Sequence, residues 1–536
     1  MARPKPFLLV ILDGFGVSLE TIGNPVAEAK KPAMDRFERN FPYTTLQASG
    51  VAVGLPWGEA GNSEVGHLTM GAGRVLHHHL PRIIHAIRDG SFFDNPALSA
   101  VAEHVKKNGS RLHVAGLVSS GSVHSYADHL EALVEWAGRA GIGEVLIHVF
   151  TDGKDAPPRQ GADFLKGLAG RLAALHPGAR YASVSGRFYA MDRDEKWDRV
   201  QKAYALMTEG TGERIASVPE YLRASYARGI DDGFIEPAIV LEGGGNLPST
   251  IDHRPPTIQE HDAVIFLNFR EDSMRELIHA FTDDDFRGFP RKKVPDLFVA
   301  TMTEYEKNLA GAMPLFPAAD IQRPLGKVLS DAGLRQLRIA ETEKYAHVTY
   351  FFNGGDERPL PLEDRMLVAS APVAHFDEAP EMRAAEITAK IIEHMGTYDV
   401  VIANFANADM VGHSGNFSAA VRAVQALDAA LGTLSEAVLA AGGVMVITAD
   451  HGNIELKRSA ISGEKLTEHS INPVPMMLIG EQYRRQHPRA PEEIRRAKSE
   501  VNGILTDVAP TILALLGIEK PAEMTGQDLL PRLLSL

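Results

Sequence analysis

The chain has 536 residues, 44% of them hydrophobic and 23% charged, a composition typical of soluble globular proteins with room for two or more domains. Its 69 acidic residues outnumber 55 basic ones, and the formal charge of −14 disfavours a general nucleic-acid or anionic-membrane binder. The chain has no cysteine, and its apolar start at 7–12 is too short for a signal peptide or membrane span, so we expect a cytoplasmic protein.

The first predicted element is a central strand of a parallel sheet over residues 7–12, because such strands are apolar on both faces. Asp13 and Gly14 follow it directly. Open α/β sheets bind their ligands at the carboxyl ends of their strands, which makes Asp13 a candidate site residue. A plain turn aspartate before glycine fits the position equally well.

The next feature is Ser63, a single hydroxyl in the small-residue stretch 61–67. It does not form the nucleophile elbow of α/β-hydrolases, because Val65 occupies the position that needs the second glycine. If Ser63 is a nucleophile, something other than a histidine base must activate it. The alternative is a serine that caps a helix, with Glu64 in the first turn.

Residues 80–315 alternate helical patterns with short apolar runs, as βα units do. Basic side chains follow the runs that end near residues 118, 150, 186 and 267: His124, Lys154, Arg187, Arg193 and Arg270. Each alone would be a solvated surface charge. Several cations at the ends of consecutive strands instead predict an anion pocket within an acidic protein.

Three further segments of this region have structural interpretations. The triplet His77 to His79 is interpreted as structural, because consecutive side chains point in different directions. A helix is expected to begin at Met191, since apolar side chains recur at helical spacing after it. Residues 313–320 contain two prolines within four residues and are predicted to form a linker.

The last third of the chain contains two further strand patterns, at 400–405 and 443–448, each followed by an acid and a histidine. Asp409 and His413 are four residues apart and share one face if that turn is helical. The whole chain thus offers three carboxylates, three histidines and one hydroxyl, a set large enough for two divalent ions. These residues are Asp13, Ser63, Asp409, His413, Asp450, His451 and His469.

Six ordered motifs resemble those of the cofactor-independent phosphoglycerate mutases, members of the alkaline phosphatase superfamily. They read ILDG at 11–14, GNSEVGH at 61–67, SGRFYAMDRD at 185–194, ETEKY at 341–345, DMVGH at 409–413 and ADHGN at 449–453. The resemblance extends over almost the whole chain. It implies an α/β fold with an alkaline-phosphatase-like core domain, residues 1–79 and 318–536, and an inserted second α/β transferase domain that binds substrate, residues 80–317.

The resemblance also implies two divalent metal ions, for which the family uses mainly manganese. Asp409, His413 and His469 would hold one ion, and Asp13, Asp450, His451 and Ser63 would hold the other. A metal lowers the pKa of a coordinated hydroxyl, so Ser63 would become a nucleophile without a histidine base.

The implied reaction moves phosphate from 3-phosphoglycerate to Ser63 and back to the other hydroxyl of the glycerate, without 2,3-bisphosphoglycerate, in glycolysis and gluconeogenesis. Asp155 would act as general acid and base, and Lys344 would bind the transferring phosphoryl group. The substrate would be held by His124, Lys154, Asp155, Arg187, Arg193, Arg270 and Lys344. We expect a monomer with a small-molecule substrate and with neither a nucleic acid nor a membrane as partner.

The chain departs from the family pattern in its substrate half. Lys154 stands where the family has an arginine, and lysine cannot make a planar bidentate contact. Ser273 stands where the family has a second arginine three residues beyond Arg270, and Arg275 is a candidate replacement. These changes leave open a phosphatase or mutase of the same superfamily acting on another small phosphorylated acid. A non-enzymatic two-domain binding protein would have no use for the metal set and the serine.

Overall fold

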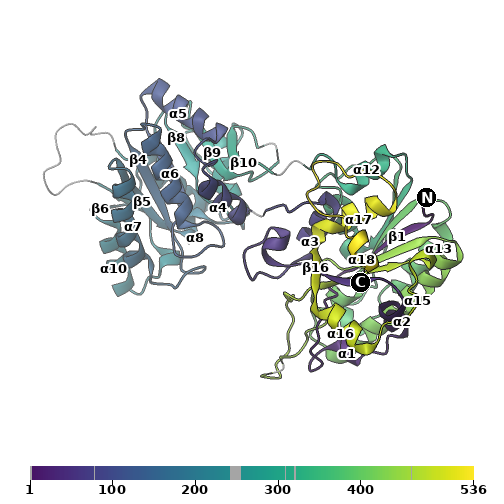
Figure 1. Cartoon of the computed structure of the whole chain (residues 1–536). Helices are drawn as coiled ribbons and strands as arrows, with labels where there is room; N and C mark the ends of the chain where they lie inside the picture. Colours follow the sequence, from purple (N-terminus) through teal and green to yellow (C-terminus); the bar gives the residue numbers. More distant parts are fainter. Residues whose placement is uncertain are drawn as a thin grey trace. The chain divides into compact units, whose positions relative to one another are not determined.

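The computed structural model describes residues 3–77, 79–241, 255–307, 309–318, 321–459 and 461–535 (Figure 1). The chain forms two compact units: unit 1 comprises Met1–His78 and Ala319–Leu536, and unit 2 comprises His79–Ala318. Each unit has its own eight-stranded sheet. The α/β class with a second α/β domain inserted into the core is therefore confirmed. His78, in the middle of the histidine triplet, lies outside the described residues.

The sheet of unit 1 has the strand order β12-β11-β13-β1-β14-β15-β2-β16. Its strands are β1 Phe7–Leu12, β2 Tyr43–Gln47, β11 Gln336–Glu341, β12 Glu363–Val368, β13 Val400–Phe405, β14 Val444–Thr448, β15 Val474–Ile479 and β16 Val501–Ile504. Only β15 runs antiparallel to its neighbours. The central strand predicted at 7–12 is confirmed, because β1 is fully buried and pairs in parallel with β13 and β14.

The helices of unit 1 pack around this sheet, with α15 against α13 and α2, and α3 against α12 and α17. They are α1 Pro25–Glu28, α2 Pro32–Asn40, α3 Ser63–Ala72, α12 Leu325–Asp331, α13 Ala384–His394, α14 Asn407–Gly412, α15 Phe417–Ala440, α16 Pro491–Ser499, α17 Val508–Leu515 and α18 Leu530–Ser535. Short 3-10 turns occur at Gly50–Val53, Thr342–Lys344, Phe376–Glu378, Glu481–Tyr483 and Leu505–Asp507, and a π-helical turn at His347–Phe351. Helix α15 is long and apolar enough to cross a membrane, but its packing on β14 is that of a core helix, so its length is weak evidence for a span.

The sheet of unit 2 has the order β10-β9-β8-β3-β4-β5-β7-β6, and all its pairs are parallel except β5 with β7. Its strands are β3 Leu112–Leu117, β4 Val145–Thr151, β5 Ala179–Gly186, β6 Glu213–Ile215, β7 Ala238–Val240, β8 Ala263–Phe266, β9 Phe298–Thr303 and β10 Ala312–Phe316. Its helices are α4 His79–Asp89, α5 Pro96–Asn108, α6 Ala127–Arg139, α7 Gly161–Leu175, α8 Arg187–Ala190, α9 Trp197–Glu209, α10 Val218–Ala227 and α11 Arg275–Thr282, with a 3-10 turn at Asp232–Phe234.

Unit 2 has an apolar core on each face of its sheet. In β8, Ala263 and Ile265 join the core shared with α5, α6, α7 and α10, whereas Val264 and Phe266 join the core shared with α9 and α11. Both faces of β8 are therefore buried. Because successive side chains of a strand point to opposite faces, such a strand must be apolar at every position.

One local prediction for unit 2 is wrong and another is confirmed only in part. The helix expected from Met191 begins at Trp197, because the Asp192 carboxylate accepts the backbone N–H groups of Asp194 and Lys196 and holds a turn there. The segment 313–320, interpreted as a linker, contains the boundary between the two units after Ala318, and its residues 319 and 320 lie outside the described ones. Its first residues instead belong to strand β10, which contains Pro314 and pairs only with β9 at the edge of the sheet. A proline is tolerated in an edge strand because it need not donate to a neighbour on the open side.

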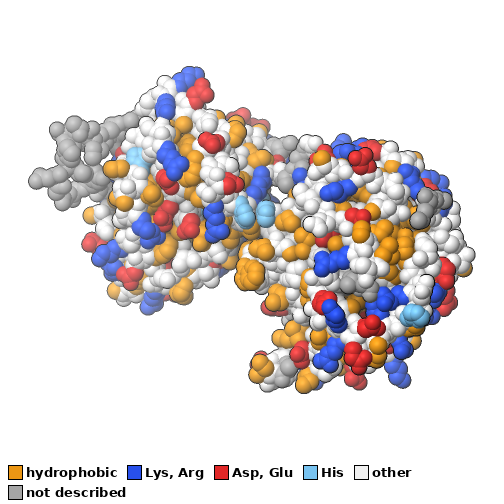
Figure 2. Space-filling view, viewed as in Figure 1, with side chains coloured by type: hydrophobic (Ala, Val, Ile, Leu, Met, Phe, Trp, Pro, Cys, Tyr) orange, Lys and Arg blue, Asp and Glu red, His pale blue; other side chains and the backbone are white. Residues whose placement is uncertain are grey.

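On the face seen in Figure 2, basic and acidic side chains alternate over the surface of each unit. The described residues on this face form no extended patch of one charge.

Candidate functional site

Three acidic side chains meet at one edge of the unit 1 sheet because they follow three adjacent parallel strands. Asp13 directly follows β1, Asp409 lies in α14 after β13, and Asp450 follows β14 by two residues. All three are at least 97% buried. Gly14 makes this convergence possible, since its φ is +72° and an added Cβ would lie 2.7 Å from the Cα of Asp409.

Ser63 is the first residue of α3, and its hydroxyl points at these acids. The helix is capped by Asn62, whose side chain accepts the backbone N–H of Val65 at 2.9 Å, so the alternative of a capping serine is wrong. The Ser63 Oγ lies 2.9 Å from Asp13 Oδ1 and 3.0 Å from His451 Nε2.

Lys344 lies at the centre of the same cluster, in the turn that follows β11. Its Nζ donates to Ser63 Oγ at 2.7 Å and contacts Asp13 Oδ1 at 2.7 Å and Asp409 Oδ2 at 2.6 Å. Burial alone would lower the pKa of Lys344, but the carboxylates raise it above its ordinary value. The lysine in turn holds the pKa of Asp13 and that of Asp409 well below the usual range, against the effect of burial. Lys344 thus places a positive charge beside the Ser63 hydroxyl.

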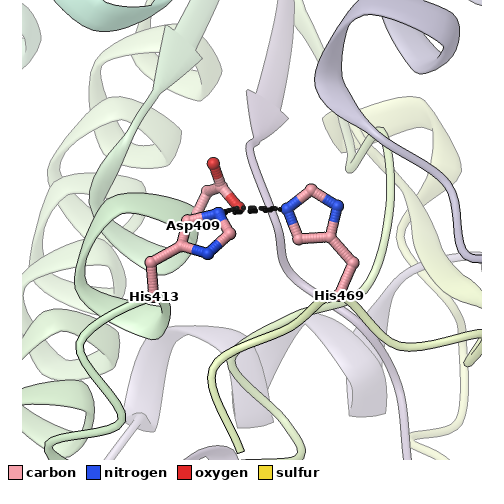
Figure 3. Close-up of side chains that lie close together, drawn as sticks. All are labelled: Asp409, His413 and His469. Atoms are coloured by element: carbon pink, nitrogen blue, oxygen red, sulfur yellow. Dashed lines mark hydrogen bonds and ion pairs between the residues drawn. The ribbon is translucent and has the colours of Figure 1, made fainter. Parts of the chain in front are cut away.

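Two groups of possible metal ligands flank this lysine. In one, His413 Nε2 and His469 Nε2 lie 3.3 Å and 3.1 Å from Asp409 Oδ1 (Figure 3). His413 comes from the end of α14, four residues after Asp409, as the sequence predicted, and His469 comes from the loop before β15. The other group consists of Asp13, Asp450 and His451, with ligating atoms within 4.8 Å of one another.

The charges and donor types of these groups fit divalent cations. Although burial opposes it, the carboxylates of Asp450, Asp13 and Asp409 raise the pKa of His451 to about 9. The three carboxylates outnumber the single lysine, and a divalent cation at this place would neutralise the same excess of negative charge. Mixed imidazole and carboxylate donors are typical ligands of Mn²⁺ and Zn²⁺.

In unit 2, all six side chains predicted there as substrate ligands line one cavity of about 500 Å³, which also contains Ser273. These six are His124, Lys154, Asp155, Arg187, Arg193 and Arg270. They come from the segments that follow β3, β4, β5 and β8, with Arg187 as the first residue of α8, as expected from the carboxyl ends of parallel strands. Lys344, the seventh predicted substrate ligand, belongs to unit 1.

Asp152 and Asp155 organise the wall of this cavity. Asp152 Oδ1 accepts the backbone N–H groups of Lys154 and Asp155 and a guanidinium N–H of Arg187 at 2.6 Å. Asp155 contacts His124 Nδ1 at 2.6 Å and Arg187 Nη1 at 2.9 Å. Burial would raise the pKa of Asp155, but His124 and Arg187 hold it below its ordinary value.

A further carboxylate that sequence reasoning missed orders the other wall. Asp272 binds Arg270 through Nε and Nη2, at 3.1 Å and 3.0 Å, and binds Arg193 Nη1 at 2.8 Å. Its place two residues after Arg270 gave no signal of a role for it. Arg275 does not replace the missing family arginine, because its Nε donates to the Tyr305 carbonyl at 3.0 Å and it is not among the cavity-lining residues.

Comparisons with known proteins agree with a metal-dependent enzyme. The family model of the Metalloenzyme superfamily matches residues 5–520. The chain is 45% identical over 531 residues to the 2,3-bisphosphoglycerate-independent phosphoglycerate mutase of Moorella thermoacetica, which covers 99% of both chains. It is 48% identical over 527 residues to the enzyme of that name from Synechococcus sp. (strain JA-3-3Ab), covering 98% of this chain and 96% of the relative. Among solved structures, phosphoglycerate mutase of Leishmania mexicana at low cobalt concentration matches 98% of both chains, with 31% identity and a TM-score of 0.58.

Proposed function

The chain belongs to the 2,3-bisphosphoglycerate-independent phosphoglycerate mutases, isomerases that interconvert 3-phosphoglycerate and 2-phosphoglycerate, and we propose that it does so through a phosphoserine at Ser63. The observation that carries this proposal is the position of the Ser63 hydroxyl, within hydrogen-bond distance of Lys344, Asp13 and His451. Full-length identity of 45% to 48% to mutases speaks against the alternative, a phosphatase or mutase for another phosphorylated acid.

The enzyme binds divalent metal, and we propose two ions, with manganese as the metal used. Asp409, His413 and His469 would hold one ion, and Asp13, Asp450, His451 and Ser63 would hold the other. The two separate donor groups around Lys344 support this assignment. Bound there, the ions would supply charge neutralisation for the phosphoryl oxygens and would lower the pKa of the Ser63 hydroxyl.

Ser63 Oγ would attack the phosphorus of 3-phosphoglycerate, forming a P–O bond to serine while the P–O bond to the C3 oxygen breaks. The positive charge of Lys344, which the neighbouring carboxylates favour by raising its pKa, would stabilise the negative oxygens of the phosphoryl group. In the return step the C2 hydroxyl attacks the phosphoserine, and Ser63 is released.

Asp155 is proposed to move the protons of the substrate. Asp155 would enter the first step protonated and give its proton to the C3 oxygen. In the second step the resulting carboxylate would take the proton of the C2 hydroxyl, so one carboxyl group serves as acid and then as base. His124 and Arg187 fix the position of the Asp155 carboxylate by direct contacts. After it has taken the proton of the C2 hydroxyl, the Asp155 carboxyl group is protonated again and can act as the acid of the reverse reaction.

The cavity of unit 2 is proposed to hold the glycerate by its anionic groups. Lys154, Arg187, Arg193 and Arg270 supply positive charge around it, and His124 supplies a further donor.

The proposed metal ligands belong to unit 1 and most substrate ligands to unit 2, so both units would contribute to catalysis. Water must be excluded while the phosphoserine exists, because water would hydrolyse the phosphoserine. We further propose that the enzyme is cytoplasmic and monomeric.

The test is to incubate manganese-loaded enzyme with 3-phosphoglycerate and to measure 2-phosphoglycerate, inorganic phosphate and, after acid quenching, the phosphorylated residue. We expect 2-phosphoglycerate with little free phosphate, and phosphate on Ser63. Ser63→Ala should fold and be inactive, whereas the exposed control Ser462→Ala should keep full activity. Dominant phosphate release would identify a phosphatase, and a phosphohistidine or an unmodified enzyme would refute the serine mechanism.

A further inference from the structure

His67 is a fully buried histidine that no step of the reaction above uses. It lies in α3 one helical turn beyond Ser63 and has no solvent-exposed surface. Its Nδ1 lies 2.8 Å from the main-chain carbonyl oxygen of Ser63, and its Nε2 lies 3.0 Å from the Asn404 side-chain amide nitrogen. The carbonyl can only accept and the amide nitrogen can only donate, so His67 carries its proton on Nδ1 and accepts at Nε2.

Asn404 extends this connection to a proposed metal ligand. It lies in β13, where it is paired with Ile11 of β1, and its Nδ2 also donates to Asp13 Oδ2 at 2.7 Å. The Asn404 amide nitrogen thus donates one proton to His67 and the other to Asp13. The opposite amide orientation would place Oδ1 against the Asp13 carboxylate, so the contacts define which way Asn404 points.

The Nδ1 edge of the His67 ring also faces a second proposed ligand. Its Nδ1 lies 3.2 Å from Asp450 Oδ2, an oxygen that is buried without a hydrogen-bond partner among the described residues. The His347 ring packs 5.5 Å from the His67 ring and restricts its movement. One imidazole therefore contacts the backbone of the nucleophile directly, lies beside Asp450, and reaches Asp13 through one amide.

We propose that His67 is a positioning residue, which orients Ser63 through its carbonyl and orients Asp13 through Asn404. This inference rests on the proposed function, because it assumes that Ser63 is the nucleophile and Asp13 a metal ligand. A histidine used only to fill the core would not need polar partners that all belong to the site. Residues that hold metal ligands in place commonly change metal affinity or activity by about 10- to 100-fold when they are replaced.

Two substitutions separate the two connections of the ring. In His67→Asn, the amide nitrogen can occupy the place of Nδ1 and keep the bond to Ser63, but nothing replaces Nε2. In His67→Gln, the amide can occupy the place of Nε2 and accept from Asn404, but the bond to the Ser63 carbonyl is lost. Both variants remain polar and hydrogen-bonding, which favours folding, and thermal unfolding checks that they fold.

The readouts are manganese binding by calorimetry and the steady-state constants for 3-phosphoglycerate. We expect His67→Asn to weaken one manganese-binding step about 10- to 100-fold and to leave the step at Asp409, His413 and His469 unchanged. His67→Gln should bind manganese with nearly normal affinity and lose about 10- to 100-fold in kcat with little change in KM. Asn404→Leu should reproduce the binding defect of His67→Asn, and the double variant should be no worse than either one.

The inference is overturned if folded His67→Asn and His67→Gln both keep manganese affinity and kcat within twofold of the parent, or if both lose them equally. Trapping phosphoserine in the parent enzyme separates this failure from failure of the proposed function. A parent phosphorylated on Ser63 with unaffected His67 variants would refute only the positioning role, whereas a parent without phosphoserine would refute the proposed function itself.

Discussion

Replacing His129 by leucine should stabilise unit 2 and make its stability less sensitive to acid. His129 lies in α6, is fully buried, and packs against the rings of Tyr126 and Phe269. Neither ring nitrogen has a hydrogen-bond partner among the described residues. A buried N–H without a partner costs about 1–3 kcal/mol, and leucine is close in volume and favours helix, so the variant should gain about that much at pH 8.

The pH dependence follows from the pKa of this side chain. Burial lowers the pKa of His129 to about 3, whereas an unfolded histidine titrates near 6.5. Between these two values the unfolded chain binds a proton that the folded chain does not, so the free energy of unfolding decreases as the pH falls from 6.5 toward 3. At about 1.4 kcal/mol per pH unit, His129 removes about 2 kcal/mol of stability between pH 6.5 and pH 5.

The assay is urea unfolding at pH 8 and pH 5, followed by tryptophan fluorescence in a Trp57→Phe background. Two of the three tryptophans, Trp136 and Trp197, then remain, and both belong to unit 2. EDTA in both buffers prevents metal loss at low pH from contributing. The advantage of His129→Leu over its parent should be about 2 kcal/mol larger at pH 5 than at pH 8.

The matched control is His487→Leu, which replaces an exposed histidine of unit 1 and should change neither the stability nor the pH dependence of unit 2. An equal advantage at both pH values would show that His129 is not neutral in the folded state. A destabilised variant would show that the ring makes interactions that leucine cannot replace. His113 and His148, whose pKa values burial also lowers, keep part of the acid sensitivity in every variant.

Three further predictions concern the reaction. Removal of metal by EDTA should abolish turnover and added manganese should restore it; a metal-free enzyme with full activity would contradict the metal assignment. Asp155→Asn should lower kcat about 100-fold or more, because an amide can neither accept nor return the substrate proton, and an unchanged kcat would assign proton transfer elsewhere. Ser273→Arg should lower KM for 3-phosphoglycerate about 10- to 100-fold with little change in kcat, because it adds a charge-assisted contact away from the reacting phosphorus. An unchanged KM would mean that this guanidinium does not reach the substrate, since Arg275 is already bound to Tyr305.

The sequence by itself determined the strands and the residues that end them. The strands predicted at 7–12 and 400–405 have the same ends as β1 and β13, and the spacing of Asp409 and His413 matches one helical turn at α14. These features depend on neighbouring residues in the chain, because hydrophobic periodicity and helical spacing are local properties. The family could be identified from the sequence because each of its motifs is a short run of neighbouring residues.

Local patterns failed where a single contact overrides propensity. The apolar spacing after Met191 is helical, yet the Asp192 carboxylate accepts the backbone N–H groups of Asp194 and Lys196 and holds a turn, so the helix begins only at Trp197. Pro314 argued against a helix and a central strand, and it lies in the edge strand β10, which the linker interpretation had missed. Neither the turn held by Asp192 nor the edge position of β10 can be predicted from composition.

Only the tertiary structure decided how the site is held together. Lys344 meets Ser63 across 281 positions of the chain, and Asn404 meets His67 across 337. Asp272 binds both Arg270 and Arg193. Arg275 donates a hydrogen bond to the Tyr305 carbonyl. These contacts depend on which strands lie side by side and on the rotamers that packing allows, so they are set by the folded chain as a whole. The sequence therefore specifies which chemical groups stand at the strand ends, and the order of the strands in the sheet specifies which of those groups meet.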